Sequence, residues 1–108
     1  MRLKTRLKVL DSCKRALEKH IVITHGTDTM TETAAVLGEA ALDKTIVLTG
    51  AMVPYTVSNS DAVFNLGCAI TAAQCCTKGV YIAINGRIFT WDNVVKVKEK
   101  GVFEEKAQ

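Results

Sequence analysis

The sequence predicts an α/β domain with a parallel sheet, because short β-branched runs alternate with helical patterns along the chain. The runs are residues 21–24, 45–49 and 80–84, and a helical pattern precedes each of them. At 108 residues, with 48% hydrophobic and 23% charged residues, the chain has the size and composition of one globular domain. This composition excludes disordered, collagen-like and low-complexity proteins.

The first helix, predicted at about residues 2–19, is basic and amphipathic. Residues 1–20 contain seven Lys or Arg and two acidic residues, a net charge of +5. Nucleic-acid or anionic-membrane binding is one function of such a helix, and the solvated face of a packed helix is the alternative. No aromatic side chain lies among the charges to stack on bases. We therefore expect a packed helix, with no nucleic acid and no membrane as partner. The stripe expected to pack has helical spacing: Leu3, Leu7, Leu10, Cys13 (or Lys14) and Leu17.

The later elements have recognisable start and turn signals. Thr29 and Glu32 have the spacing of a capping box, which predicts a helix start directly after the first strand. Ser60 is the expected N-cap of a further helix at residues 61–76. Asn85-Gly86 predicts a two-residue hairpin after the third strand. Together these signals predict a βαβαβ core followed by a hairpin.

Two loops are expected at the carboxyl edge of the sheet, where open α/β sheets bind ligands. Residues 24–29 place hydroxyls, a carboxylate and a glycine just before a helix N-terminus, which favours an anion, and residues 49–52 follow the next strand. Neither loop has the GxGxxG or GxxxxGK[ST] pattern, so we expect no dinucleotide, no nucleoside triphosphate and no other cofactor. For Thr27, Asp28 and Thr29, the residues alone favour capping and turn formation over a role in a small polar ligand site.

The cysteines and histidines predict neither disulfides nor a metal. The N-terminal residues alternate charge with leucine and form no apolar secretory core, and no apolar run could span a bilayer. We therefore expect a cytoplasmic protein with four reduced thiols, of which Cys68, Cys75 and Cys76 fill the core. The two histidines lack ligand spacing to a cysteine, so no structural metal is expected.

Four segments resemble, in order, motifs of the bacterial-type L-asparaginases, the family that includes the glutaminase-asparaginases. Ile-Val-Ile-Thr-His-Gly-Thr-Asp-Thr-Met-Thr-Glu-Thr-Ala at residues 21–34 resembles the second signature of that family. Val-Leu-Thr-Gly-Ala-Met-Val-Pro at 47–54 is similar to its strand ending in Gly-Ala-Met-Arg-Pro. Residues 60–66 resemble its Ser-Asp-Gly-Pro-Phe-Asn-Leu, and residues 79–85 with 92–96 resemble the segment leading to its catalytic lysine.

The resemblance implies a fold and a set of site residues. The fold is a three-layer, flavodoxin-like (Rossmann-like) sheet, with residues 1–108 forming a single, partial asparaginase N-terminal domain. Thr27, Asp28 and Lys96 match the family's Thr-Lys-Asp triad, in which a lysine accepts the proton of the hydroxyl. Asp28 also matches the residue that binds the substrate's α-ammonium group. Ala51 matches a position whose backbone carbonyl lies beside the side-chain amide. Without the resemblance, Lys96 in its run of charges would be interpreted as a surface residue.

The sequence also departs from the family pattern. The first signature, a strand ending in Thr-Gly-Gly-Thr-Ile with the first catalytic threonine, is absent from these 108 residues, as are the Gly-Ser-Gln/Asp segment and the C-terminal domain. Val53 stands where the family has Arg, and Ala62-Val63 where it has Gly-Pro. We therefore expect a truncated or split asparaginase that hydrolyses asparagine weakly or not at all without a partner.

The alternative function is a non-catalytic remnant that serves in assembly or weak amino-acid binding. The strand at residues 21–24 would be an open edge of the sheet, because the family's first strand would lie beside it. A second copy or a complementary polypeptide is therefore the expected partner. The sequence does not distinguish a preference for asparagine from one for glutamine, because the discriminating segments are absent.

Overall fold

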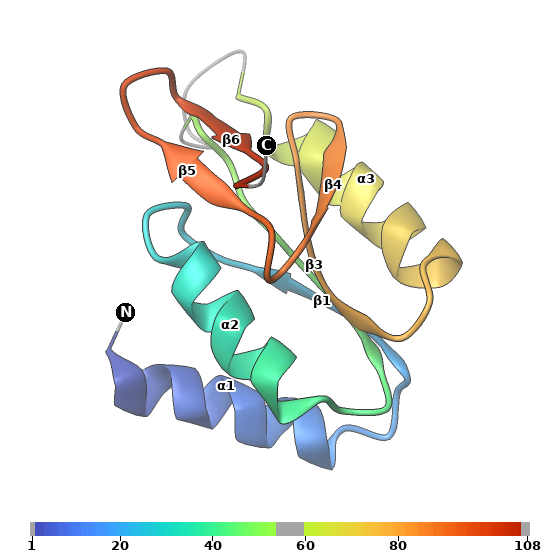
Figure 1. Cartoon of the computed structure of the whole chain (residues 1–108). Coiled ribbons are helices and arrows are strands. Elements are labelled where there is room, and N and C mark those ends of the chain that lie inside the picture. Colours follow the sequence, from blue (N-terminus) through green and yellow to red (C-terminus); the bar gives the residue numbers. More distant parts are fainter. Residues whose placement is uncertain (1, 54–59, 107–108) are drawn as a thin grey trace.

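The computed structural model describes residues 2–53 and 60–106, which form nine helices and strands (Figure 1). In chain order these are α1 (Leu3–Arg15), β1 (His20–Thr24), α2 (Met30–Ala40), β2 (Thr45–Thr49), α3 (Ala62–Cys75), β3 (Gly79–Ile84), β4 (Arg87–Thr90), β5 (Val95–Val97) and β6 (Val102–Glu104). The predicted α/β fold is confirmed. Pro54 and the rest of residues 54–59, part of the loop after β2, lie outside the described residues.

The main sheet has the strand order β1-β2-β3-β4. β1 pairs with β2 and β2 with β3 in parallel, while β4 returns antiparallel to β3 through the predicted Asn85-Gly86 hairpin. Both turn residues have positive φ, 55° and 75°, as a type I′ turn requires. Since Thr24 is in register with Thr49, the loops after β1 and β2 leave the sheet at the same edge.

Successive side chains in the buried strands point to opposite faces of the sheet, so the core forms one cluster on each face. Ile46 and Leu48 of β2 face the side covered by α2 and α1, whereas Val47 packs among the alanines of α3 on the other side (Figure 1). Phe103 of β6 is buried in the first of these clusters. The small β5–β6 sheet is therefore anchored on the α2 side, which fixes the segment that carries Lys96.

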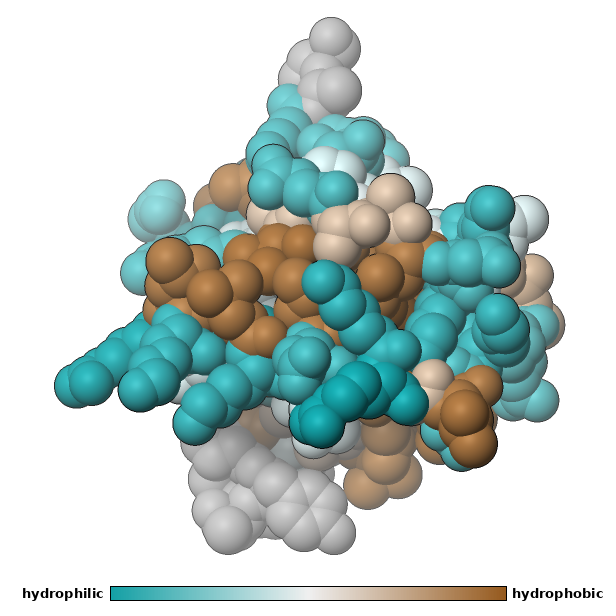
Figure 2. Space-filling view, turned by 90° about the horizontal axis from the view of Figure 1, so that it is seen from below, coloured by the Kyte–Doolittle hydropathy of each residue, from teal (hydrophilic) through white to brown (hydrophobic). Residues whose placement is uncertain are grey.

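The predicted apolar stripe of the first helix is only partly correct. The helix spans residues 3–15 and not 2–19, so Leu17 lies beyond its end and is 92% exposed. Cys13 is buried and Leu10 packs on the core, but Leu3 and Leu7 are exposed. Seen from below, the side on which α1 lies in Figure 1, the molecule shows an apolar band bordered by hydrophilic residues (Figure 2).

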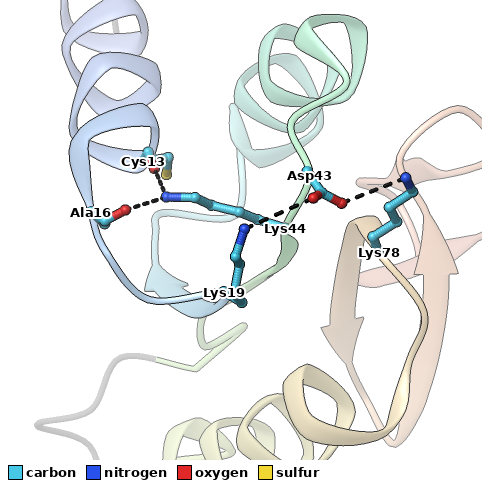
Figure 3. Close-up of polar contacts among 6 residues, drawn as sticks. All are labelled: Cys13, Ala16, Lys19, Asp43, Lys44 and Lys78. Carbon is cyan, nitrogen blue, oxygen red and sulfur yellow. Dashed lines mark hydrogen bonds and ion pairs between the residues drawn. The ribbon is translucent and has the colours of Figure 1, made fainter.

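The end of α1 is set by a lysine from elsewhere in the chain. Lys44, just before β2, donates from Nζ to the backbone carbonyls of Cys13 and Ala16, which would otherwise lack partners at the helix C-terminus (Figure 3). Beside it, Asp43 forms ion pairs with Lys19 and Lys78. These contacts tie α1, β2 and β3 together at the edge opposite the loops after β1 and β2.

Two further local predictions are wrong. Thr29 is the N-cap of α2, but its side chain makes no capping hydrogen bond. The Glu32 carboxylate forms an ion pair with Arg6 of α1 at 3.1 Å. The cysteines do not all fill the core: Cys75 is exposed and Cys68 is half-buried.

The helix predicted at residues 61–76 is confirmed within one residue at each end, and Ser60 Oγ accepts from the Ala62 N–H at its start.

Candidate active site

Three side chains from distant parts of the chain meet at the carboxyl edge of β1. Lys96 Nζ donates to Thr27 Oγ1 at 2.8 Å and to Asp28 Oδ1 at 2.6 Å. The lysine side chain is only 15% exposed, whereas that of Asp28 is 75% exposed. Figure 1 shows β5, which carries Lys96, beside the loop that leads into α2. The structure thus brings together the three residues predicted as catalytic; their catalytic role stays a prediction.

The charge of the lysine stabilises the aspartate in its ionised form. The hydrogen bond from Lys96 lowers the pKa of Asp28 most, its positive charge adds to this, and the charge of Lys98 contributes less. A small desolvation effect acts in the opposite direction. Asp28 is therefore an anion whose exposed surface is free to meet a cationic group, as an ammonium-binding residue requires.

The titration of Asp28 gives a first testable prediction. Its pKa in the folded protein should lie below the ordinary value of 3.8, so the stabilisation from this pair is present above that value and is lost as the pH falls through the lowered pKa. Lys96→Met should raise the pKa of Asp28, measured by NMR of the side-chain carboxyl carbon. Lys98→Met, the matched control, should raise it less; equal pKa values in Lys96→Met and the unsubstituted protein would contradict the assignment.

Ala51, the fourth predicted site residue, lines a separate cavity. This cavity of about 330 Å³ lies where β1 and β2 end against the first turn of α3. Its lining residues are Thr24, His25, Thr49, Gly50, Ala51, Ala62, Val63 and Leu66. The lining includes none of the triad residues Thr27, Asp28 and Lys96. Within the described residues, the triad and Ala51 therefore lie in neighbouring parts of the same sheet edge, and no triad residue lines the cavity beside Ala51.

A buried asparagine that the sequence analysis did not single out holds the turn before Ala51. Asn65 of α3 donates from Nδ2 to the Gly50 carbonyl at 2.8 Å and to Asp61 Oδ2 at 2.9 Å, and its Oδ1 accepts from the Asn85 N–H. It therefore joins the loop after β2, the start of α3 and the β3–β4 turn. In the sequence, the only indication of this role was that Asn65 lies in the family-like motif at residues 60–66.

Asp61 completes this network from the start of α3. Its carboxylate accepts hydrogen bonds from the N–H groups of Met52 and Val53, the residues that follow Ala51. Burial pushes the pKa of Asp61 upward, but these two bonds and the one from Asn65 outweigh it and keep the pKa below its usual value. The ionised carboxylate thus joins the loop after Ala51 to the start of α3.

Two contacts position the residues around the triad. One ring nitrogen of His25 lies 2.8 Å from Thr33 Oγ1 and the other 2.7 Å from the Gly26 carbonyl oxygen, which holds the loop before Thr27 against α2. Trp91 lies over Gly38 of α2, where an added Cβ would come within 2.4 Å of the indole ring. The absence of a side chain at Gly38 therefore lets the segment leading to Lys96 approach α2.

The described residues contain no cluster of three His, Cys, Asp or Glu side chains that could hold a metal ion. Among the same residues, no helix is both long and apolar enough to cross a membrane.

Similarity to known proteins shows the family of this chain. The family model described as "Asparaginase, N-terminal" matches residues 1–104. The chain belongs to the asparaginase family. An L-asparaginase from Thermococcus kodakarensis is 43% identical over 84 residues, covering 76% of this chain and 26% of its own length. A glutaminase-asparaginase from Acinetobacter glutaminasificans is 41% identical over 93 residues, covering 82% of this chain and 28% of its own length.

The fold agrees with a solved structure of the family over almost the whole chain. The thermostable L-asparaginase from Thermococcus kodakarensis superposes with a TM-score of 0.90 and 32% sequence identity, covering 97% of this chain and 34% of that structure. The asparaginase N-terminal fold inferred from the motifs is thereby confirmed. The chain spans about a quarter of the length of the curated relatives it matches.

Proposed function

We propose that this asparaginase-family chain carries part of an amidohydrolase site that converts L-asparagine and water to L-aspartate and ammonia. One observation carries the proposal: a largely buried lysine bridges Thr27 Oγ1 and Asp28 Oδ1, across 69 and 68 residues of sequence. A hydroxyl needs such a base to become a nucleophile. From the run of charged residues around it, Lys96 would otherwise be interpreted as a surface residue, and a surface lysine would not be expected to bridge two such distant side chains.

Each residue has a defined task in the proposed reaction. In the proposed reaction Lys96 first releases its extra proton to water and then accepts the proton of Thr27 as the hydroxyl oxygen attacks the side-chain amide carbon. That proton then passes to the leaving nitrogen, so that ammonia departs and an ester to the enzyme remains. Water hydrolyses the ester and restores the hydroxyl. Asp28 orients Lys96 and binds the substrate ammonium group, and the carbonyl of Ala51 accepts from the substrate amide.

We further propose that these residues need a complementary segment, contributed by a longer chain, a second copy or another polypeptide. β1 is the edge of the four-stranded sheet formed by the described residues and contains no lysine or proline to block pairing. The segments that hold the substrate and close over it in the family are also needed, and neither a Thr-Gly-Gly-Thr-Ile nor a Gly-Ser-Gln/Asp motif occurs in these residues.

The test replaces the matched segment of the Thermococcus kodakarensis L-asparaginase by residues 1–104 of this chain and measures ammonia release from L-asparagine. We expect release, and a loss of about 10²–10⁴-fold on Thr27→Val or Lys96→Met. Thr29→Val is the matched control, because the Thr29 side chain makes no capping hydrogen bond; it should change the rate less than about 3-fold. The 108-residue chain alone should release no more ammonia than its Thr27→Val variant.

A folded but inactive chimera would contradict the proposal, and the remnant function would replace it. Activity that survives Lys96→Met would equally contradict the role of the lysine.

A further inference from the structure

The outer side of α1 exposes leucines to solvent. From the sequence we expect a packed helix and no membrane partner, because a packed helix would bury its leucines. The inner side of α1 does pack: Cys13 is buried, and Val9 and Leu10 lie against the core. Leu3 is nevertheless 58% and Leu7 49% exposed. These two leucines therefore have no role in holding α1 on the domain, and exposed apolar side chains that are gathered together indicate an interaction site.

Lysines form a row beside the exposed leucines. Leu3 and Leu7 are four residues apart, as are Lys4 and Lys8, so each pair forms one row along the helix surface. The rows are neighbours, because each lysine directly follows a leucine, and both lysines are exposed. In the described part of the chain, the ion pairs of α1 involve its two arginines and neither of these lysines. The outer side of α1 thus combines an apolar row with a row of unpaired cations.

The charge of this region is complementary to an anionic lipid surface. Residues 1–20 carry a net charge of +5, and the only acidic residue of α1, Asp11, forms an ion pair with Arg15. Anionic headgroups attract lysine, and the boundary between headgroups and acyl chains accepts leucine. A nucleic acid would bind the lysines but leave the leucines in water, and residues 1–20 contain no aromatic side chain for base stacking. An anionic lipid surface therefore satisfies both rows, whereas a nucleic acid satisfies one.

The leucine row lies apart from the other sites of the molecule. The groove between α1 and β1 is lined on the helix by Val9, Ser12 and Cys13 among others, so a segment that pairs with β1 would contact those residues and not Leu3 or Leu7. Figure 1 shows α1 along one side of the molecule and β5, with the candidate active site, on the opposite side. Seen from the α1 side, hydrophilic residues border apolar ones (Figure 2). A surface bound to α1 would therefore leave the candidate active site open to solution.

We propose that α1 attaches this chain to the surface of an anionic membrane, with the helix lying parallel to that surface. Leu3 and Leu7 enter the boundary between the headgroups and the acyl chains. Lys4 and Lys8 extend beside them, and their ammonium groups bind the negatively charged headgroups. The attachment is peripheral and reversible, because only a short apolar row enters the lipid.

The test measures co-sedimentation of the 108-residue chain with vesicles of phosphatidylcholine alone, or of equal parts of phosphatidylcholine and phosphatidylglycerol. We expect at least about 10-fold tighter binding to the anionic vesicles, and loss of most of this difference in about 500 mM salt. Leu3→Gln/Leu7→Gln and Lys4→Gln/Lys8→Gln should each weaken binding to the anionic vesicles at least about 10-fold. Glutamine is a good helix former, so circular dichroism should show that both variants keep α1.

The exposed apolar face of α3 provides the matched control. Phe64 and Ile70 are exposed to a similar extent as the two leucines of α1, but α3 contains no charged residue. Phe64→Gln/Ile70→Gln should therefore bind the anionic vesicles as the unsubstituted chain does. Equal binding to both kinds of vesicle, no binding to either, or a loss of binding in this control as large as in the α1 variants would overturn the proposal. Binding lost in the lysine variant but kept in the leucine variant would also overturn it, and would indicate a nucleic acid or another polyanion as the partner.

Discussion

Asn65→Ala is expected to lower the free energy of unfolding by about 3–4 kcal/mol. The asparagine is fully buried, and its amide makes three hydrogen bonds to three separate segments. Alanine removes these partners from the Gly50 carbonyl and the Asn85 N–H, whose hydrogen bonds to Asn65 are partly buried, and each such loss costs about 1–3 kcal/mol. Because small domains have only about 5–15 kcal/mol of stability, the variant should unfold at markedly lower urea concentration.

Urea denaturation followed by circular dichroism measures this effect. Gln74→Ala is the matched control on the same helix, because its amide donates to the Ile70 carbonyl on the exposed side. It should change the stability by less than about 0.5 kcal/mol. Asn65→Asp should also be strongly destabilising, since it places a second carboxylate beside Asp61. If Asn65→Ala matched Gln74→Ala in stability, the network would not hold the loop as described.

The parallel core was predictable because its signals are local. The runs at residues 45–49 and 80–84 are β-branched and apolar, and both strands are buried between helices. The Asn85-Gly86 turn was predictable from its own two residues, since both readily adopt positive φ. The local predictions failed where a side chain from a distant part of the sequence determines the structure. Lys44 binds the carbonyl of Cys13 near the end of α1, and Glu32 of the predicted capping box forms an ion pair with Arg6 of α1.

The candidate site was predictable to different degrees for the same reason. Thr27 and Asp28 lie in a loop before a helix, where local chemistry already indicates a polar site. Lys96 carries no such signal, and only the family resemblance placed it beside Thr27. Asn65 was not predicted, because its role depends on three tertiary hydrogen bonds. The exposed apolar face of α3 was likewise missed, since helical spacing alone does not show which face meets the sheet.

Gly50→Ala is expected to lower the free energy of unfolding by about 3 kcal/mol and to separate the two loops of the candidate site. An added Cβ would lie 2.2 Å from the carbonyl oxygen of His25, far inside normal contact, and 3.1 Å from Met30 Cε. The methionine methyl group can move, but the His25 carbonyl belongs to backbone whose N–H donates to the Thr49 carbonyl at 2.8 Å. The clash must therefore force β1 and β2 apart at their carboxyl ends.

The displacement of β1 from β2 in Gly50→Ala should also lower the rate of ammonia release. The loop with Thr27 follows β1, and Ala51 follows β2. A shift of about 1 Å between the two strands would move Thr27 away from the place proposed for the substrate amide, and it should reduce ammonia release by the chimera about 10²-fold. Gly26→Ala is the control for stability, because nothing lies within 4 Å of its added Cβ; the change should stay within about 1 kcal/mol. If Gly50→Ala were as stable and as active as the unsubstituted chimera, the approach of β1 to Gly50 would not determine the geometry of the site.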